Sequence, residues 1–159
     1  MQRVGIGYDV HRLEPGRELR LGGVKIDYPK GLAGHSDGDA LAHAVADAML
    51  GAAALGDLGA HFPESDPRWR DAPGEAIVGR AAELLREAGF RVVNVDANVL
   101  AEAPRLAPVR DEIRRSLARM LGVEEGRVSV KARTCEGLDA VGRGEAIACQ
   151  AVVAIERAG

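Results

Sequence analysis

The sequence predicts an α+β fold, in which a mixed β-sheet carries helices packed on one face. Stretches that alternate apolar and polar residues indicate strands, and stretches with apolar residues every three or four positions indicate helices. Strands and helices of these kinds follow one another along the chain, and strands at both ends enclose the helices, which favours one layer of sheet and one layer of helices. Since 159 residues suffice for one core, we expect a single domain over residues 1–159.

The first half contributes two strands and a helix. Residues 3–11 and 19–28 are the predicted strands of an extended, hairpin-like start, and paired glycines in the second strand predict a bend or bulge. A helix rich in alanine and leucine is expected to begin near residue 37. Ser36 and Asp39 precede its apolar positions with the spacing of a capping box, so Ser36 is the expected cap.

The second half begins with a long connection, residues 56–73, that has glycines, prolines and aspartates but no sustained period. Connections of this length are usually functional. The elements expected after it are a helix at 75–89, a strand at 90–101, a helix at 108–122 and strands at 127–133 and 145–156.

The last strand is apolar on both of its faces. Ile147, Cys149 and Val153 alternate with Ala148 and Val152, which are themselves small or apolar. Because helices are expected on only one face of the sheet, self-association is the simplest cover for the other face.

Composition excludes several classes of function. The net charge of −3 indicates neither a nucleic-acid-binding surface nor an acidic tail. No leader-like segment opens the sequence, and no apolar run approaches the roughly 20 residues that a membrane-spanning helix needs. We therefore expect a cytoplasmic protein without nucleic-acid or membrane partners. Two cysteines without Cys-x-x-Cys spacing indicate no disulfide framework.

The segment "GYDVHRL" holds the first candidate metal ligands. Asp9 and His11 lie two residues apart in a strand, so their side chains point to the same side. His43 lies in the first helix, with Asp39 and Asp47 one turn to either side. Together Asp9, His11 and His43 would supply the three N/O ligands of a catalytic zinc, and Asp47 or Asp39 could hold the second ring nitrogen of His43.

A second metal assignment stays open at this point. Two histidines and one carboxylate with open positions also describe non-haem Fe(II) oxygenases. Their usual order is His-x-Asp followed by a distant histidine, whereas here the aspartate comes first.

Two further segments carry candidate phosphate chemistry. "GHSDGD" places His35 and Ser36 at a helix N-terminus, which favours an anion, although capping alone would also explain Ser36. Thr134 is the only threonine in the chain and lies beside Glu136. Glu136 could ligate a hard cation such as Mg²⁺ together with substrate phosphate oxygens, or the segment is only a strand end and a turn.

Five segments together resemble one known family. "GYDVHRL", "HSDGDALAHAVADAMLGAAALGDLG", "FPESD", "AEAPRLAP" and "KARTCEGLDAVGRGEAIA" are similar, in order and spacing, to the 2-C-methyl-D-erythritol 2,4-cyclodiphosphate synthase family of the non-mevalonate isoprenoid pathway. The resemblance implies a homotrimer with sheets facing inward and three active sites between neighbouring subunits. It also implies metal-dependent intramolecular phosphoryl transfer, in which 4-diphosphocytidyl-2-C-methyl-D-erythritol 2-phosphate yields the cyclic diphosphate and CMP.

The resemblance also implies the ligands of two metal ions and the catalytic residues. Zinc falls on Asp9, His11 and His43, and Mg²⁺ or Mn²⁺ falls on Glu136 with the substrate diphosphate. His35, Thr134 and Glu136 match the catalytic positions, His35 and Thr134 by contacting phosphate in the transition state.

The remaining substrate contacts implied by the resemblance fall into four groups. Those beside the metal ligands and near the ribose are Val10, Ser36, Asp57, Leu58 and Gly59. Those of the loop over the erythritol phosphate are Phe62, Pro63, Glu64, Ser65 and Asp66. Those of the cytidine pocket, reached across a subunit boundary, are Ala101, Glu102, Ala103, Pro104, Arg105, Leu106 and Ala107. Those near the diphosphate and the trimer axis are Arg133, Cys135 and Arg143.

This chain departs from the family pattern at three positions. Arg133 and Cys135 flank Thr134 where members often carry a run of threonines, so backbone amides would replace the lost hydroxyl contacts. Ala140 replaces a residue that is often aromatic, beside Arg143, at a central channel where isoprenoid diphosphates have been proposed to bind. A trimeric, metal-containing CDP-binding module without turnover remains the alternative to the enzyme.

Overall fold

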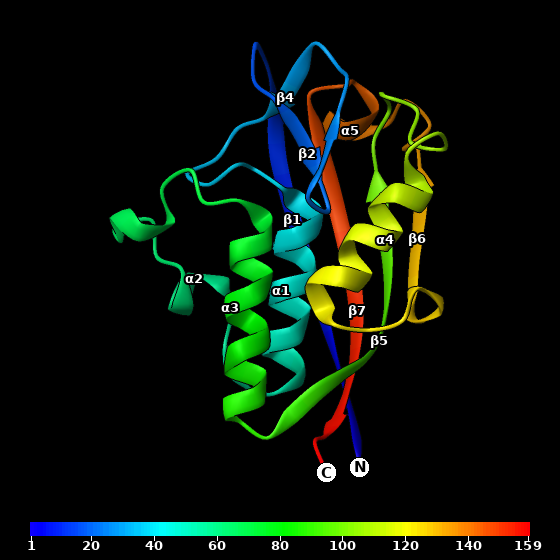
Figure 1. Cartoon of the computed structure of the whole chain (residues 1–159). Coiled ribbons are helices and arrows are strands. Elements are labelled where there is room, and N and C mark those ends of the chain that lie inside the picture. The colour runs from blue at the N-terminus through cyan, green and yellow to red at the C-terminus, as the bar shows by residue number, and fades with distance from the viewer.

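A five-stranded mixed sheet with helices on one face forms the body of the protein, which confirms the predicted fold class (Figure 1). The computed structural model describes residues 1–159. Its strands are β1 (Gln2–Pro15), β2 (Leu19–Leu21), β3 (Val24–Ile26), β4 (Lys30–Leu32), β5 (Phe90–Leu100), β6 (Val128–Arg133) and β7 (Ala146–Arg157). Its helices are α1 (Ala40–Ala52), α2 (Leu58–His61), η1 (Pro67–Trp69), α3 (Gly74–Glu87), α4 (Arg110–Leu121), η2 (Glu125–Arg127) and α5 (Asp139–Gly142).

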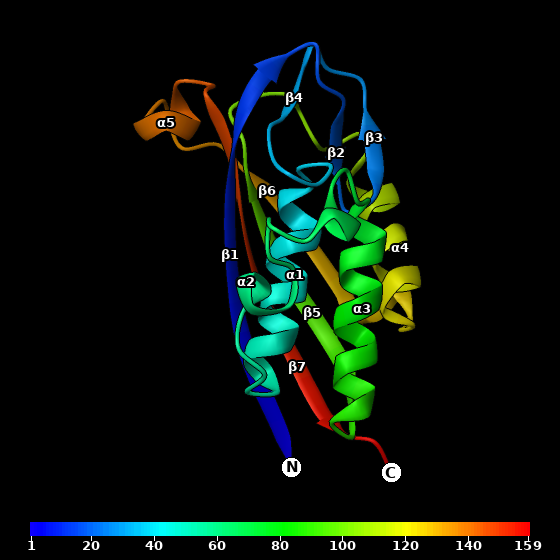
Figure 2. The same ribbon diagram turned by 90° about the vertical axis from the view of Figure 1, so that its left-hand side faces the viewer.

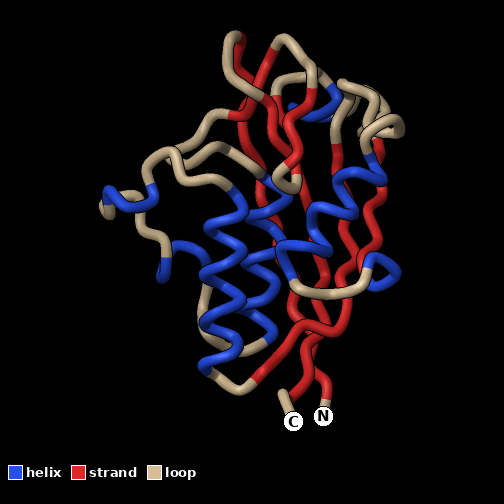
Figure 3. The backbone as a smooth tube through the Cα atoms, in the orientation of Figure 1, coloured by secondary structure: helices blue, strands red, loops and turns tan.

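The sheet is mixed because only one neighbouring pair of strands is parallel. The strand order is β4-β1-β7-β5-β6, with β5 and β6 parallel and the other neighbours antiparallel. β7 lies in the middle, paired with β1 along one edge and with β5 along the other (Figure 3). The chain therefore ends as a central strand, beside the strand with which it begins.

Helix α1 packs directly on the backbone of β1, and small residues permit that approach. A Cβ atom built on Gly5 or Gly7 would lie 2.0 Å from a carbonyl oxygen of α1, that of Ala48 or Ala44 respectively. Only glycine fits at both positions without moving the helix. Since α1 carries His43 and β1 carries Asp9, this contact sets the distance between candidate ligands on two different elements.

The start of the chain differs from the predicted hairpin. β1 pairs with β4 and β7, whereas β2 and β3 form a separate two-stranded sheet. Gly22 and Gly23, with φ of 59° and 78°, form the turn between these two short strands, so the expected bend or bulge inside one strand was wrong. Two consecutive positive φ angles are typical of a tight hairpin turn.

The expected cap of the first helix was also wrong. Helix α1 begins at Ala40, and its N-cap is Asp39, whose side chain accepts from the backbone N–H of Ala42. The same buried carboxylate also accepts from the amides of Gly22 and Gly23, at 2.8 and 2.7 Å. Asp39 thus joins the helix start to the β2–β3 turn.

The sheet face opposite the helices is exposed and partly apolar. Val4, Ile6, Tyr8 and Val10 of β1 line it, with exposed fractions from 67% at Val4 to 47% at Val10. Figure 2 shows α1, α3 and α4 together on one side of the sheet and α5 projecting on the other. This exposed apolar stripe is what the predicted self-association would cover.

The long connection at 56–73 contains the short helices α2 and η1, which the sequence did not predict. The aspartates Asp57 and Asp66 begin them, each accepting from a backbone N–H three or two residues later.

No helix of the protein combines the length and the apolarity required to cross a bilayer.

Candidate metal centre and cavities

Asp9, His11 and His43 converge on one point between β1 and α1. Asp9 Oδ2 lies 2.8 Å from His11 Nε2 and 3.0 Å from His43 Nδ1, and the two nitrogens are 3.3 Å apart. The predicted juxtaposition is therefore present, since strand alternation places Asp9 and His11 on the face that α1 covers.

This geometry fits a tetrahedral metal ion. Metal–nitrogen distances of about 2.0–2.1 Å place neighbouring ligands of a tetrahedral zinc roughly 3.3 Å apart. The three donor atoms lie within 3.3 Å of one another, and the donors are one carboxylate and two imidazoles. Asp9, His11 and His43 could accordingly hold one zinc-like ion and leave a position open toward solvent or substrate.

A backbone carbonyl fixes the orientation of His11. Its Nδ1 lies 2.5 Å from the carbonyl oxygen of Ala33, which can only accept, so Nδ1 carries a proton and Nε2 faces Asp9. Burial lowers the pKa of His11, but the hydrogen bond and charge of Asp9 outweigh it and raise that pKa. For Asp9 the two effects have the opposite signs. Burial raises the pKa of Asp9, but the hydrogen bonds from His11 and His43 outweigh burial and lower that pKa below its usual value.

The expected partner of the second His43 nitrogen was wrong. Asp39 is occupied by backbone amides, and burial raises its pKa although those amides oppose the rise. Asp47 accepts from the backbone N–H of Leu58 at 3.1 Å. The partner is Ser36, whose Oγ lies 3.0 Å from His43 Nε2.

A cavity of about 380 Å³ opens at the metal cluster. The predicted site residues that line it are Asp9, His11, His35, Ser36, His43, Leu58, Gly59, Phe62, Pro63 and Glu64. His35 Nε2 is buried and has no hydrogen-bond partner within the chain. An unpaired buried imidazole nitrogen beside a cavity is a suitable contact for a ligand oxygen.

Of the residues predicted beside the metal ligands, near the ribose and in the loop over the erythritol phosphate, four lie outside the lining of this cavity. Val10 points to the exposed face of the sheet, opposite Asp9 and His11. Asp57 and Asp66 cap short helices, and hydrogen bonds from Arg68 lower the pKa of Asp66. Ser65 is exposed.

Sequence reasoning missed two residues of this cavity, Trp69 and Ile77. Trp69 packs edge-on against Phe62 with ring centroids 4.7 Å apart, and its indole Nε1 is buried without a partner. The single tryptophan of the chain, in a loop that already looked functional, was the available signal.

A second, separate cavity of about 190 Å³ lies at the ends of β5 and β6. The predicted residues lining it are Ala101, Glu102, Pro104, Arg105, Leu106, Ala107, Arg133 and Thr134. Ala103, Cys135 and Glu136 belong to the same segments but not to its lining. The predicted site therefore divides, within one chain, into a half with the candidate metal ligands and a half with the residues predicted for the cytidine pocket.

Glu136 adopts a backbone conformation that is costly for a residue with a side chain. Its φ is 54°, and its amide donates to Thr134 Oγ1 at 3.4 Å. A non-glycine residue with this φ lowers the stability of the fold by roughly 1 kcal/mol or more, and such residues often occur at functional sites.

Arg143, the predicted residue near the trimer axis, forms an ion pair with Glu145 at 2.9 Å.

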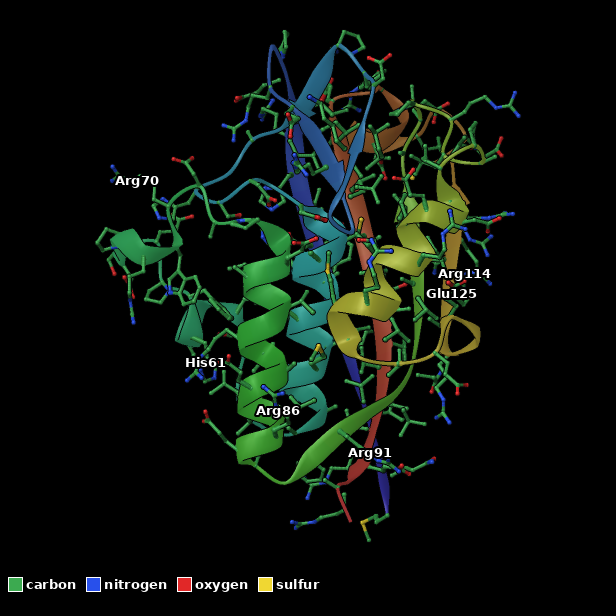
Figure 4. All side chains as sticks on the ribbon, viewed as in Figure 1. His61, Arg70, Arg86, Arg91, Arg114 and Glu125 are labelled. Carbon is green, nitrogen blue, oxygen red and sulfur yellow. The ribbon has the colours of Figure 1, made fainter.

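The fourth histidine does not join the cluster. His61 of α2 contacts the Leu55 carbonyl oxygen through Nε2 at 2.8 Å. Figure 4 labels His61 at the edge of the helical layer. The same figure labels Arg114 of α4 and Glu125 of η2, which form an ion pair at 3.8 Å.

The fold and the cluster define a class: mixed-sheet proteins in which one carboxylate and two imidazoles that could hold a metal ion meet between a strand and a helix. Within that class, the chain belongs to the YgbB family, whose model matches residues 2–156. A curated 2-C-methyl-D-erythritol 2,4-cyclodiphosphate synthase of Salinibacter ruber is 56% identical over 98% of this chain and 99% of its own length. The corresponding protein of Geobacillus kaustophilus is 51% identical over 99% of both chains.

Solved structures agree with this assignment. A 2C-methyl-D-erythritol-2,4-cyclodiphosphate synthase in its CDP-bound form matches with a TM-score of 0.90 and 38% identity, over 97% of this chain and 100% of that one. The bifunctional IspDF of Campylobacter jejuni matches with a TM-score of 0.95 and 38% identity, over 99% of this chain and 43% of that longer chain.

Proposed function

We propose that this protein is a 2-C-methyl-D-erythritol 2,4-cyclodiphosphate synthase acting through one domain over residues 1–159. It would convert 4-diphosphocytidyl-2-C-methyl-D-erythritol 2-phosphate to the cyclic diphosphate and release CMP. The observation that carries the proposal is the convergence of Asp9, His11 and His43 beside a cavity that His35 also lines. The names of the relatives indicate the reaction class. The three donor atoms lie close enough together to hold the metal ion that this reaction would use.

The reaction needs no protein base. The attacking group is the substrate's own phosphate, whose second pKa is about 6, so it is largely ionised near neutral pH. The protein must instead bring two anionic groups together and stabilise the charge that develops on transfer.

The side chains divide the work as follows. A zinc ion held by Asp9, His11 and His43 would polarise the attacked phosphoryl group, and Mg²⁺ or Mn²⁺ at Glu136 would neutralise the leaving group. The unpaired His35 Nε2 supports a hydrogen bond to phosphate in the metal cavity. Thr134 lines the second cavity, where its hydroxyl would donate to a phosphate oxygen.

The proposal includes a homotrimer. Two observations support it: the site is divided between two cavities of one chain, and the sheet carries an exposed apolar stripe. Association of sheet faces would cover Val4, Ile6 and Tyr8 and would let the metal cavity of one subunit meet the second cavity of its neighbour.

The test uses the cytidyl substrate with Zn²⁺ and Mg²⁺, followed by ³¹P NMR. Signals of a cyclic diphosphate together with CMP, suppressed by a chelator, are expected. Unchanged substrate with tight CDP binding would favour the binding module instead. Iron in protein purified without chelator, with oxygen-dependent chemistry, would favour the Fe(II) alternative.

A further inference from the structure

Ser36 lies where the metal cluster meets the cavity, and its hydroxyl has two neighbours in the chain. Its Oγ is 3.0 Å from His43 Nε2, and the amide of Gly38 donates to it at 3.3 Å. A serine hydroxyl has one proton to donate and two lone pairs that accept. Since the Gly38 amide takes one lone pair, the direction of the Ser36–His43 hydrogen bond decides where the hydroxyl proton points.

Without a metal ion, the proton of neutral His43 belongs on Nδ1. That nitrogen lies 3.0 Å from Asp9 Oδ2, a carboxylate oxygen that can only accept. His43 Nε2 is then bare, and the Ser36 hydroxyl donates to it. In this arrangement the hydroxyl proton is used inside the protein.

With a metal ion bound by His43 Nδ1, the hydrogen bond must reverse. Nδ1 then gives up its proton to solvent and Nε2 takes one up, so the neutral ring keeps one proton and changes only its tautomer. Nε2–H now donates to Ser36, and both lone pairs of the hydroxyl are occupied. The chain offers the hydroxyl proton no other acceptor, and Ser36 lines the cavity beside His35.

We propose that Ser36 is a positioning residue that couples occupancy of the metal site to ligand binding, by turning its hydroxyl proton into the cavity only when His43 holds a metal ion. The ligand group that receives this proton is a phosphoryl oxygen. This inference rests on the proposed function for the identity of the ligand, but the reversal at His43 requires only the metal.

The first test measures the tautomer of His43 by ¹⁵N NMR, in metal-free protein at pH 8 and after loading with zinc alone. The protonated nitrogen is expected to change from Nδ1 to Nε2. His61 is the internal control, because its Nε2 faces the Leu55 carbonyl and keeps its proton in both states. A His43 ring that carries its proton on Nε2 in both states would overturn the proposal whatever reaction the protein catalyses.

The second test measures the binding of inorganic phosphate by ³¹P NMR, with and without one zinc per chain. Ser36→Ala is expected to weaken phosphate binding about tenfold in the zinc-loaded protein and to leave it unchanged without zinc. Its zinc affinity should fall about 10–100-fold, as for other residues that orient metal ligands. Ser36→Thr, which keeps the hydroxyl, should restore both.

Ser116→Ala is the matched control, because Ser116 is also buried, on α4, and lies outside the cavity. An equal loss of phosphate affinity with and without zinc would show that the Ser36 hydroxyl is an ordinary contact and would overturn the coupling. Failure of the cyclase assay alone, with the tautomer change intact, would instead overturn only the proposed reaction.

Discussion

Replacing Gly7 by alanine tests whether the approach of α1 to β1 sets the metal geometry. The added Cβ would lie 2.0 Å from the Ala44 carbonyl oxygen, whereas ordinary contact begins at 3.4 Å. The obstacle is backbone on both sides, so the helix must move away by about 1 Å or more because the interior is close-packed. His43 precedes Ala44 on that helix and would move with it.

The displacement can be compared with what a metal site tolerates. Ligand distances in such sites hold to within about 0.2 Å, so a shift of about 1 Å at His43 exceeds the tolerance several-fold. We expect Gly7→Ala to lose high-affinity zinc binding and to lower the free energy of unfolding of the metal-free protein by about 1–3 kcal/mol, as for other overpacked cores.

Competition with a chromophoric chelator measures the first effect, and denaturant unfolding of metal-free protein measures the second. Gly79→Ala is the matched control, since no atom lies within 4 Å of the position and the residue is inside α3. It should stabilise the protein by roughly 0.5–1 kcal/mol and leave zinc affinity unchanged. Wild-type zinc affinity and stability in Gly7→Ala would refute the reasoning.

Three further predictions concern the metal sites. His43→Ala should abolish zinc loading and turnover while the oligomer persists in sedimentation; full activity would contradict the zinc assignment. Glu136→Gln should lower turnover with zinc still bound by elemental analysis, and an unchanged rate would remove Glu136 from the mechanism. Zinc affinity should fall as pH drops through the raised pKa of metal-free His11, because the ring must then release a proton to bind. A pH-independent zinc affinity between pH 5.5 and 8 would contradict this.

The candidate metal ligands were predictable because each depends on a short-range rule. Alternation along β1 puts Asp9 and His11 on one face, and both lie opposite the start of an apolar helix that carries His43. The mixed sheet was predictable for the same reason, since the period of each segment gives its type and the order of the types limits the architecture.

The partners of those ligands were not predictable, because they depend on the path of a loop. Ser36 and Asp39 are both good capping residues, and only the turn at Gly38, with φ of 75°, decides that Asp39 caps the helix while Ser36 reaches His43. Trp69 lines the cavity because of the path that the long connection takes, and no periodicity in the sequence predicts that path. Tertiary contacts override local preference at such positions.

The division of the site between two cavities has a genetic consequence. If each active site takes its metal half from one chain and its Thr134 half from a neighbour, two different inactive chains can together form an intact site. A mixture of His43→Ala and Glu136→Gln chains, assembled at random in equal amounts, would rebuild about a quarter of the sites, because each half is intact with a chance of one half. Two such alleles would therefore partly complement each other in one cell, because mixed oligomers would contain intact sites that neither variant forms alone.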